Sequence, residues 1–310
     1  MDKWLEYEGF SRVAALQSFT AAAASLGITA SAVSKQVRSL EERLGVRLLH
    51  RTTRRVSLTA EGRGFYQRLR GVLEDVADAE QELGNAQAEL RGSLRIGAPM
   101  DFGRLHLAAP LAEFAASHPG IELEVEFTDR FVDLVEDGLD VGVRIGKLAD
   151  SSLVARRLAP CRRVLCASPA YLAEQGEPRV PSDLRRCHKI AYTYDNDQSW
   201  SFQSANDQGG EVRVSVPIRH RANNGHMLCA LLRAGQGIAL VPTFLASDDL
   251  RTGRLKSVLD GSLRADISIH AVYPHRRQLS SKVRRLVDFL AQHCGARPYW
   301  DDELVLGAAD

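Results

Sequence analysis

One uninterrupted heptad pattern restricts the architecture of this chain more than any other feature of the sequence. Apolar residues recur from residue 65 to residue 90 at spacings that alternate between four and three: Phe65, Leu69, Val72, Val76, Ala79, Leu83, Ala86 and Leu90. A 3.5-residue repeat sustained over more than three heptads is typical of a coiled-coil seam. A core helix of a globular domain is usually shorter, ~10–14 residues. We therefore predict a dimerising linker helix over residues 60–91.

A linker in this position divides the 310 residues into a small N-terminal part and a large C-terminal part. A chain of this length is too long for one average core, which favours two domains. We expect domains at 1–59 and 92–300, with residues 301–310 as a tail. No apolar run approaches the ~20 residues that a membrane span needs. The first residues lack a secretory pattern, and five cysteines, an odd number, do not suggest a disulfide framework. These features predict a cytoplasmic protein without a membrane partner.

Positive charge is concentrated in the N-terminal part, although the net charge of the chain is only +1. Residues 35–55 contain seven Lys or Arg residues and two acidic ones. A basic block on a nearly neutral chain is typical of a nucleic-acid-binding end. The alternative, a solvated helix face, does not require the arginines to continue into the turn that follows the helix.

The pattern around this block predicts a helix-turn-helix. Two short helices are expected within residues 10–26, the second capped by Ser18 or Thr20, with Gly27 as its exit. Thr29 is placed to cap a third helix, whose inward side chains would be Val33, Val37, Leu40 and Leu44. The opposite face has small hydroxyls at its N-terminal end and cations beside them. This arrangement suits a helix that reads base edges while Lys and Arg neutralise phosphates.

A short strand at residues 55–58 follows the basic turn and predicts a two-stranded wing over the DNA backbone or minor groove. We expect DNA contacts from the third helix and the wing, through Ser31, Ser34, Lys35, Arg38, Arg51, Arg54 and Arg55.

After Gly92 the sequence alternates between strand-like and helix-like segments, which predicts an α/β domain with a mostly parallel sheet. Strands are expected at 93–98, 121–127, 141–145, 164–167, 190–194, around 212–216, 238–241 and 267–273. Helices are expected at 104–117, 131–136, 169–174, 225–234 and 280–293. About 200 residues allow two lobes, with lobe I at about 92–165 and 270–300 and lobe II at about 166–269. The chain would cross between them near residues 165–168 and 269–271.

The N-terminal part resembles the winged helix-turn-helix of LysR-type transcriptional regulators. The resemblance rests on residues 18–49, SFTAAAASLGITASAVSKQVRSLEERLGVRLL, and on residues 51–62, RTTRRVSLTAEG. The segments LRIGAP (94–99), DVGVRIG (140–146) and AGQGIALVP (234–242) look like the effector domain of the same family. One departure is Ala30, where family members usually have Gln. Because Ala cannot make the amide contacts of Gln to adenine, the base preference next to this position is expected to differ.

The resemblance covers nearly the whole chain and implies a periplasmic-binding-protein-like pair of lobes. It also implies binding to double-stranded promoter DNA, a small-molecule inducer between the lobes, and assembly through the linker, usually to a tetramer. Contact with RNA polymerase is a further expected role. No enzyme activity, cofactor or metal is expected, because the sequence has no P-loop, dinucleotide fingerprint, nucleophile elbow or paired Cys-x-x-Cys.

The effector site is expected at the carboxyl ends of strands in lobe I. There Pro99, Met100, Asp101, Phe102 and Gly103 would form a helix N-terminus whose N–H groups are able to hold a carboxylate. The resemblance implies that the same cleft is lined by Thr128, Arg144, Tyr194, Asn223 and Asn224.

Asp101 has two interpretations, because family members often carry a small hydroxyl residue at this position. Its charge would oppose an anionic inducer, unless Arg144 or another cation neutralises it, and would favour an amine or a hydroxylated aromatic. Alternatively, Asp101 is a helix N-cap.

Two further hypotheses remain at this point. A chromosome-structuring protein would use its C-terminal domain only to oligomerise, and an enzyme on a binding-protein fold would need an acid–base set that these residues do not provide.

Cys161 and Cys166 are five residues apart around a strand, which makes direct pairing awkward, and Cys229 and Cys294 have the pattern of core residues. His220, His226, Asp195 and Asp197 lack a recognisable metal spacing.

Overall fold

The computed structural model describes residues 2–51, 56–83, 90–130, 133–134, 137–146, 153–194, 199–203, 211–260, 267–274, 280–302 and 304. Contacts divide the chain into two compact units, Met1–Gly92 with Asp133–Gly138, and Ser93–Val132 with Leu139–Asp310. Each is described by itself. Among the described residues, no helix combines the length and the apolar character needed to cross a membrane.

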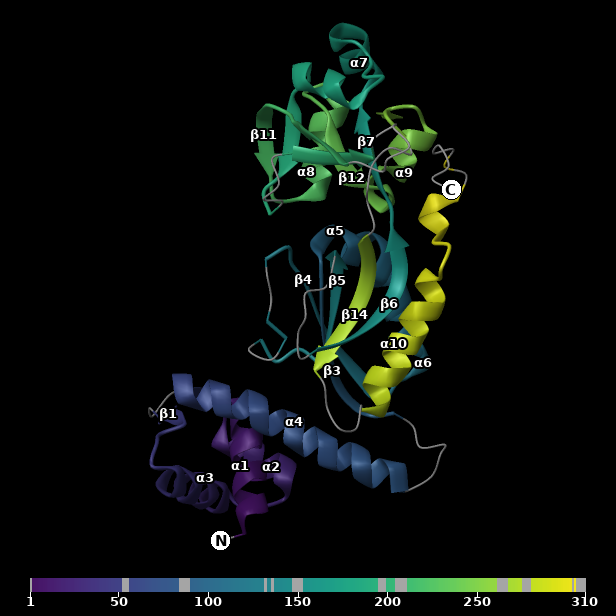
Figure 1. Cartoon of the computed structure of the whole chain (residues 1–310). Coiled ribbons are helices and arrows are strands. Elements are labelled where there is room, and N and C mark those ends of the chain that lie inside the picture. Colours follow the sequence, from purple (N-terminus) through teal and green to yellow (C-terminus); the bar gives the residue numbers. More distant parts are fainter. Residues whose placement is uncertain are drawn as a thin grey trace. The chain divides into compact units, whose positions relative to one another are not determined.

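The described residues of the first unit form three helices, a two-stranded wing and a long helix (Figure 1). These are α1 (Lys3–Leu16), α2 (Phe19–Leu26), α3 (Ala30–Leu44), β1 (Leu49–Arg51), β2 (Val56–Leu58) and α4 (Ala60–Leu83). Ser18 and Thr29 cap α2 and α3 as predicted, and Gly27 ends α2 in the left-handed conformation. The wing strands are antiparallel, with Leu49 opposite Leu58.

The core of the first unit lies where α1, α2, α3 and the start of α4 meet. Val33, Val37 and Leu40 of α3 are fully buried, as the periodicity predicts. Leu44 is 37% exposed, so the prediction that it faces inward is wrong. It is the last residue of α3, next to the left-handed cap Gly45 where the chain leaves the helix.

The long helix α4 contains the predicted heptad positions from Phe65 to Leu83, but the first of them pack within the first unit. Phe65 and Leu69 pack into the core of the first unit, and the ring of Phe65 lies 5.6 Å from that of Phe10. Val72 is 55% exposed, as expected of a seam residue in a single chain. The 24 residues of α4 span about 36 Å at ~1.5 Å per residue. Residues 84–89 lie outside the described part, and Leu90 and Arg91 are not helical, so the helix does not continue to residue 91.

Lobe I of the second unit is built on a five-stranded sheet of order β4-β3-β5-β14-β6. Its strands are β3 (Gly92–Ala98), β4 (Ile121–Phe127), β5 (Val141–Gly146), β6 (Leu153–Cys161) and β14 (Ile267–Pro274). Its helical segments are α5 (Met100–Phe102), the π-helical turn η1 (Gly103–Leu107), α6 (Ala108–Ser117) and α10 (Ser281–Cys294). A 3-10 turn, η3 (Tyr299–Asp301), follows α10 and contacts α9 (Thr243–Arg251) of lobe II.

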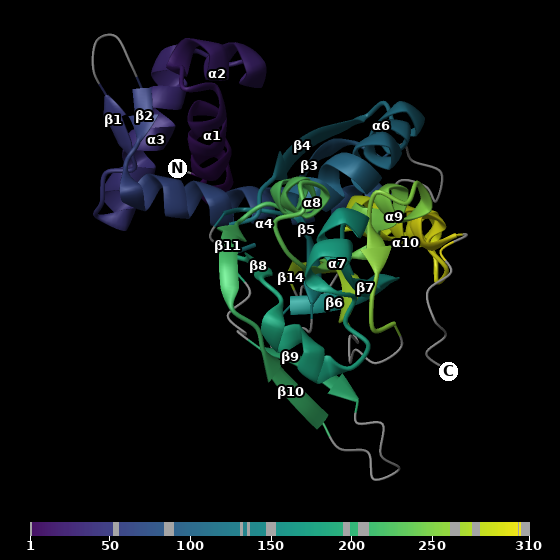
Figure 2. The same cartoon turned by 90° about the horizontal axis from the view of Figure 1, so that it is seen from above.

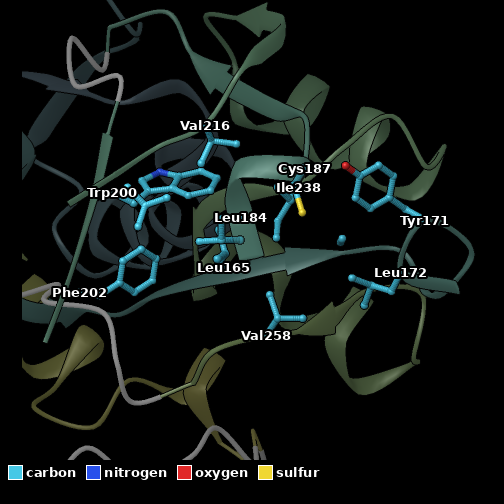
Figure 3. Packing of buried hydrophobic residues seen from close by; sticks show 12 residues of the cluster. Leu165, Tyr171, Leu172, Leu184, Cys187, Trp200, Phe202, Val216, Ile238 and Val258 are labelled. Carbon is cyan, nitrogen blue, oxygen red and sulfur yellow. The ribbon is translucent and has the colours of Figure 1, made fainter. Parts of the chain in front are cut away.

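In lobe II, the described strands form three small sheets (Figure 2). Strand β7 (Arg163–Ala167) pairs with β12 (Ala239–Pro242) and β13 (Lys256–Ser257), β8 (Lys189–Tyr192) with β11 (Ile218–Ala222), and β9 (Ser199–Gln203) with β10 (Glu211–Ser215). The helices are α7 (Pro169–Gln175), the 3-10 turn η2 (Pro181–Arg186), α8 (Gly225–Arg233) and α9 (Thr243–Arg251). Trp200, Phe202 and Leu184 fill its core together with Leu165 and Ile238 (Figure 3).

The described strand pairings are mixed, so the prediction of a mostly parallel sheet is wrong. Strand β14 runs antiparallel to both β5 and β6, whereas β3 and β5 are parallel. The reason is that β6 leads the chain out of lobe I and β14 brings it back in the opposite direction. The first crossing falls at Arg162, between β6 and β7, a few residues before the predicted position. The helix expected over 131–136 lies largely outside the described residues.

Candidate DNA-binding and effector-binding sites

Helix α3 presents the predicted polar face. Its first turn is ordered by Thr29, whose hydroxyl accepts from the backbone N–H of Ala32 at 3.2 Å and lies 3.0 Å from the Ser31 hydroxyl. Ser31, Lys35 and Arg38 are exposed and Ser34 is half-buried. Within the described part of the chain, the side chains of Lys35 and Arg38 form no ion pair. Two unneutralised cations therefore stand beside small hydroxyls on one helix face.

A buried carboxylate that sequence reasoning missed fixes α3 against α1. Glu6 is 2% exposed and accepts from the Ser39 hydroxyl at 2.6 Å and from the Arg43 guanidinium at 3.0 and 2.8 Å. The Ser39 hydrogen bond, together with Arg43, holds the pKa of the Glu6 carboxyl below its usual range. The only local signal is an acidic residue in the first turn of a helix, and its partners lie more than thirty positions away.

A second carboxylate connects α3 to the wing. Glu41 accepts from the backbone N–H groups of Leu48 and Leu49 at 2.9 and 3.1 Å, which places the start of β1. Arg51 is the last residue of β1. Arg54 and Arg55, predicted to contact DNA from the wing, lie outside the described residues.

The predicted effector residues of lobe I lie toward one edge of its sheet. Strands β3 and β5 are parallel, with Gly97 opposite Gly142. Pro99, directly after β3, and Arg144, in the second half of β5, therefore lie toward the same edge of the sheet. The backbone N–H of Thr128, after β4, donates to the Ala98 carbonyl at 2.9 Å.

Asp101 makes a contact that neither sequence interpretation anticipated. Its carboxylate accepts from the backbone N–H groups of Gly225 and His226, at 2.8 and 3.2 Å, at the N-terminus of α8 in lobe II. It does not cap its own helix, because the N-cap position of α5 is Pro99. Asn224 caps α8 in the usual way, accepting from Met227 N–H at 3.1 Å. The Asp101 side chain is buried, with 6% exposed. Its hydrogen bonds to the N-terminus of α8 connect lobe I to lobe II.

A second carboxylate occupies the N-terminus of α5 itself. Asp129 accepts from the backbone N–H of Met100 at 3.0 Å. Burial, and to a lesser extent the charge of Asp101, raises the pKa of the Asp129 carboxyl. Burial also raises the pKa of the Tyr192 hydroxyl, and the charges of Asp129 and Asp101 add to the effect. Asp129 and Tyr192 were not predicted, and both belong to this neighbourhood.

Phe102 and Gly103 pack within the protein core. Phe102 is fully buried against Phe244 of α9 and Trp300 of η3, with ring centroids 5.1 and 5.7 Å apart. A Cβ at Gly103 would lie 2.4 Å from the Phe127 ring, so the close approach requires glycine. His106 bridges the same cluster, between the Tyr299 hydroxyl at 2.7 Å and the Phe244 carbonyl at 3.1 Å. Burial lowers the pKa of its imidazole.

The remaining predicted residues lie around this junction on lobe II or at the sheet edge. Tyr194 is 51% exposed, with its ring 5.6 Å from that of Tyr192, and Asn223 is exposed one residue before the α8 cap. Arg144 is half-buried on β5 and sits opposite His270 of β14.

The cysteines lack the properties of reactive thiols. All five, Cys187 included, are free and buried. Burial raises the pKa of Cys161 to about 12 and that of Cys294 to about 11. No group of three or more potential metal ligands was found among the residues that the structure describes.

Comparison with known proteins gives the family. Residues 4–63 match the bacterial regulatory helix-turn-helix protein, lysR family, and residues 87–295 match the LysR substrate binding domain. The transcriptional regulator PtxR of Pseudomonas aeruginosa is 37% identical over 296 residues, which cover 94% of this chain and 92% of PtxR. The regulator DmlR of Escherichia coli is 36% identical over 285 residues, 92% of each chain.

Solved structures of similar proteins belong to the same family. The LysR-type regulator CrgA of Neisseria meningitidis has a TM-score of 0.59 and 32% identity, over 94% of this chain and 98% of CrgA. The virulence activator AphB of Vibrio cholerae has a TM-score of 0.57 and 27% identity, over 93% and 98%. These relatives are transcriptional regulators and not enzymes. The chain therefore belongs to the LysR family, as a DNA-binding transcriptional regulator with a winged helix-turn-helix and a two-lobed effector domain.

Proposed function

We propose that this regulator binds a dyadic promoter site through α3 and its wing and changes that binding when a small molecule enters between the lobes. The observation that carries the DNA part is the face of α3, where Lys35 and Arg38 are exposed without an ion-pair partner in the described part of the chain. We assign DNA contacts to Ser31, Ser34, Lys35, Arg38, Arg51, Arg54 and Arg55. Exposed cations beside small hydroxyls suit a helix that inserts its first turns into the major groove.

The effector part of the proposal rests on the junction around Asp101. It lies at the carboxyl end of β3 and connects both lobes, so a ligand bound there has different contacts in open and closed arrangements. A difference in affinity between two states is what allows a ligand to shift their populations. We assign the effector site to Pro99, Met100, Asp101, Phe102, Gly103, Thr128, Arg144, Tyr194, Asn223 and Asn224, with Phe102 and Gly103 acting through packing.

We further propose that the regulator works in the cytoplasm as a dimer through α4, and as a tetramer of two such dimers that contacts RNA polymerase at some promoters. The exposed Val72 on the heptad seam supports the dimer. Domain limits of 1–59, 60–91 and 92–300, with a tail at 301–310, remain part of this proposal. A dimer places two α3 helices on half-sites ~34 Å apart.

The test of the DNA-binding face is a salt titration. Affinity for a promoter fragment is measured for the wild type, Lys35→Ala and Arg38→Ala, with Arg12→Ala on α1 as an exposed-cation control. Removing one phosphate contact should lower the slope of log affinity against log salt by ~1, and loss of a base contact should weaken binding by ~1–3 kcal/mol at that base pair only. If Lys35→Ala and Arg38→Ala both keep the wild-type slope and sequence preference, as the control should, α3 does not read DNA.

A further inference from the structure

The N-terminus of α8 already has an anion bound to it, and that anion is part of the same chain. Asp101 reaches it across 124 positions of sequence and accepts from both Gly225 and His226. Free N–H groups at a helix N-terminus, with the positive end of the helix dipole, form a ready site for a carboxylate or phosphate. Here the Asp101 side chain fills that position.

The contact joins parts of the unit that are otherwise built on separate sheets. Asp101 lies in α5, directly after β3 of the lobe I sheet, and α8 packs on the strands of lobe II (Figure 1). The neighbouring Phe102 makes an apolar contact between the same lobes through Phe244. The Asp101 contact differs because it is polar. Another anion that binds the α8 N–H groups would compete with the Asp101 carboxylate for them.

The fit around the carboxylate is close. A Cβ added to Gly225 would lie 2.9 Å from Asp101 Oδ2 and 2.5 Å from a methyl carbon of Leu245. Any side chain at this position would therefore push against the carboxylate. Asp129 holds the N-terminus of α5 in a similar manner, so both helix N-termini at this junction carry a carboxylate of the chain itself.

We propose that Asp101 is a latch between the two lobes, which holds α8 against lobe I and occupies in cis the position that an anionic effector group would bind. A tethered carboxylate acts at a high effective concentration, on the order of millimolar or more, so small free carboxylates compete poorly with it. The latch therefore selects against anionic effectors and in favour of ligands without an anionic group. Its role in signalling rests on the proposed function, but the latch itself is testable without DNA or effector.

The experiment measures the lobe-to-lobe distance in the full chain. Spin labels are attached to cysteines introduced at Glu122 of lobe I and Glu174 of lobe II, both exposed, while the five native thiols are buried. We expect Asp101→Ala to broaden the distance distribution and to speed amide exchange at residues 225–226 at least ~10-fold, as loss of a charge-assisted hydrogen bond predicts. Sodium formate should slow the exchange at residues 225–226 again in this variant, because it refills the α8 N–H groups, but should not restore the distance distribution, because it is not tethered to lobe I; the wild type should be unchanged in both properties.

Two further variants keep the test decisive. Asp183→Ala removes a carboxylate that also accepts from two backbone N–H groups, but within lobe II, and should leave the lobe-to-lobe distance unchanged. If Asp101→Ala does not fold, Gly225→Ala displaces the carboxylate from the other side. It should broaden the distribution, and formate should not slow the exchange at residues 225–226, because the added methyl remains in place.

An unchanged distance distribution in Asp101→Ala, or in Gly225→Ala, would overturn the latch and leave Asp101 as a local cap. Absence of formate rescue in a folded Asp101→Ala variant would overturn the anion-position argument. Both results are independent of the proposed function, which fails instead if promoter binding does not respond to any small molecule.

Discussion

Replacing Glu6 by Gln should loosen the recognition helix, by an amount that follows from its contacts. The carboxylate is 2% exposed and accepts one hydrogen bond from Ser39 and two from Arg43. Gln keeps one acceptor oxygen but turns an NH₂ group toward the guanidinium. Hydrogen bonds to charged groups contribute ~1.5–3 kcal/mol each, and deleting one partner of a fully buried ion pair costs ~3–5 kcal/mol. Because the Arg43 side chain is 31% exposed, water compensates in part, and we expect a loss of about 2 kcal/mol.

The assay is amide exchange of α3 in the full chain, which gives a local opening free energy. Glu42→Gln, the same change at an exposed site of α3, is the control and should have little effect. The pKa of Glu6 is lowered in the folded state, so its contribution is present above the unfolded value near 4.5 and is lost as pH falls through the folded value. The difference between Glu6→Gln and the wild type should therefore shrink below about pH 4.5. A difference of the same size at pH 3 and pH 7 would refute the electrostatic explanation.

Three other predictions concern the rest of the chain. Trp300→Ala should destabilise the second unit by ~3–5 kcal/mol in a circular-dichroism melt, whereas Tyr299→Phe, which removes only the hydroxyl bonded to His106, should cost ~1 kcal/mol; equal effects would contradict the packing argument. Val72→Glu should shift the chain toward monomer in analytical ultracentrifugation. Gln67→Glu, which lies on α4 outside the heptad positions, should not, and an unchanged dimer in both variants would remove α4 from the interface. The native thiols should react with a disulfide reagent only as fast as the protein unfolds, because burial raises their pKa; rapid labelling of a folded thiol would disprove this.

The helix-turn-helix could be predicted in detail because its signals are local. Ser18, Gly27 and Thr29 stand within a few residues of the helix ends that they cap, and the spacing of Val33, Val37 and Leu40 follows one helix face. The heptad spacing along α4 was equally visible in the sequence. The sequence did not show that Phe65 packs into the core of the first unit. The periodicity of a helix does not specify which partner covers its apolar face.

The second unit was predicted less completely for identifiable reasons. Strand β6 contains exposed residues and Pro160, and α9 starts directly after Pro242, so neither shows a clean period. The role of Asp101 depends on an N-terminus that lies 124 residues further along the chain, and no local pattern carries that information. The positions of Asp129 and Tyr192 beside it likewise follow from tertiary packing.

Regulation by a small molecule is best tested by a footprint of the purified protein on its best-binding genomic fragment, at fixed salt, with and without each member of a metabolite panel. We predict a dyadic footprint of tens of base pairs that shortens or shifts with one metabolite, and we expect this metabolite to lack an anionic group. Binding without sequence preference that no metabolite changes would contradict this prediction, and would favour a chromosome-structuring protein whose second unit serves only for assembly.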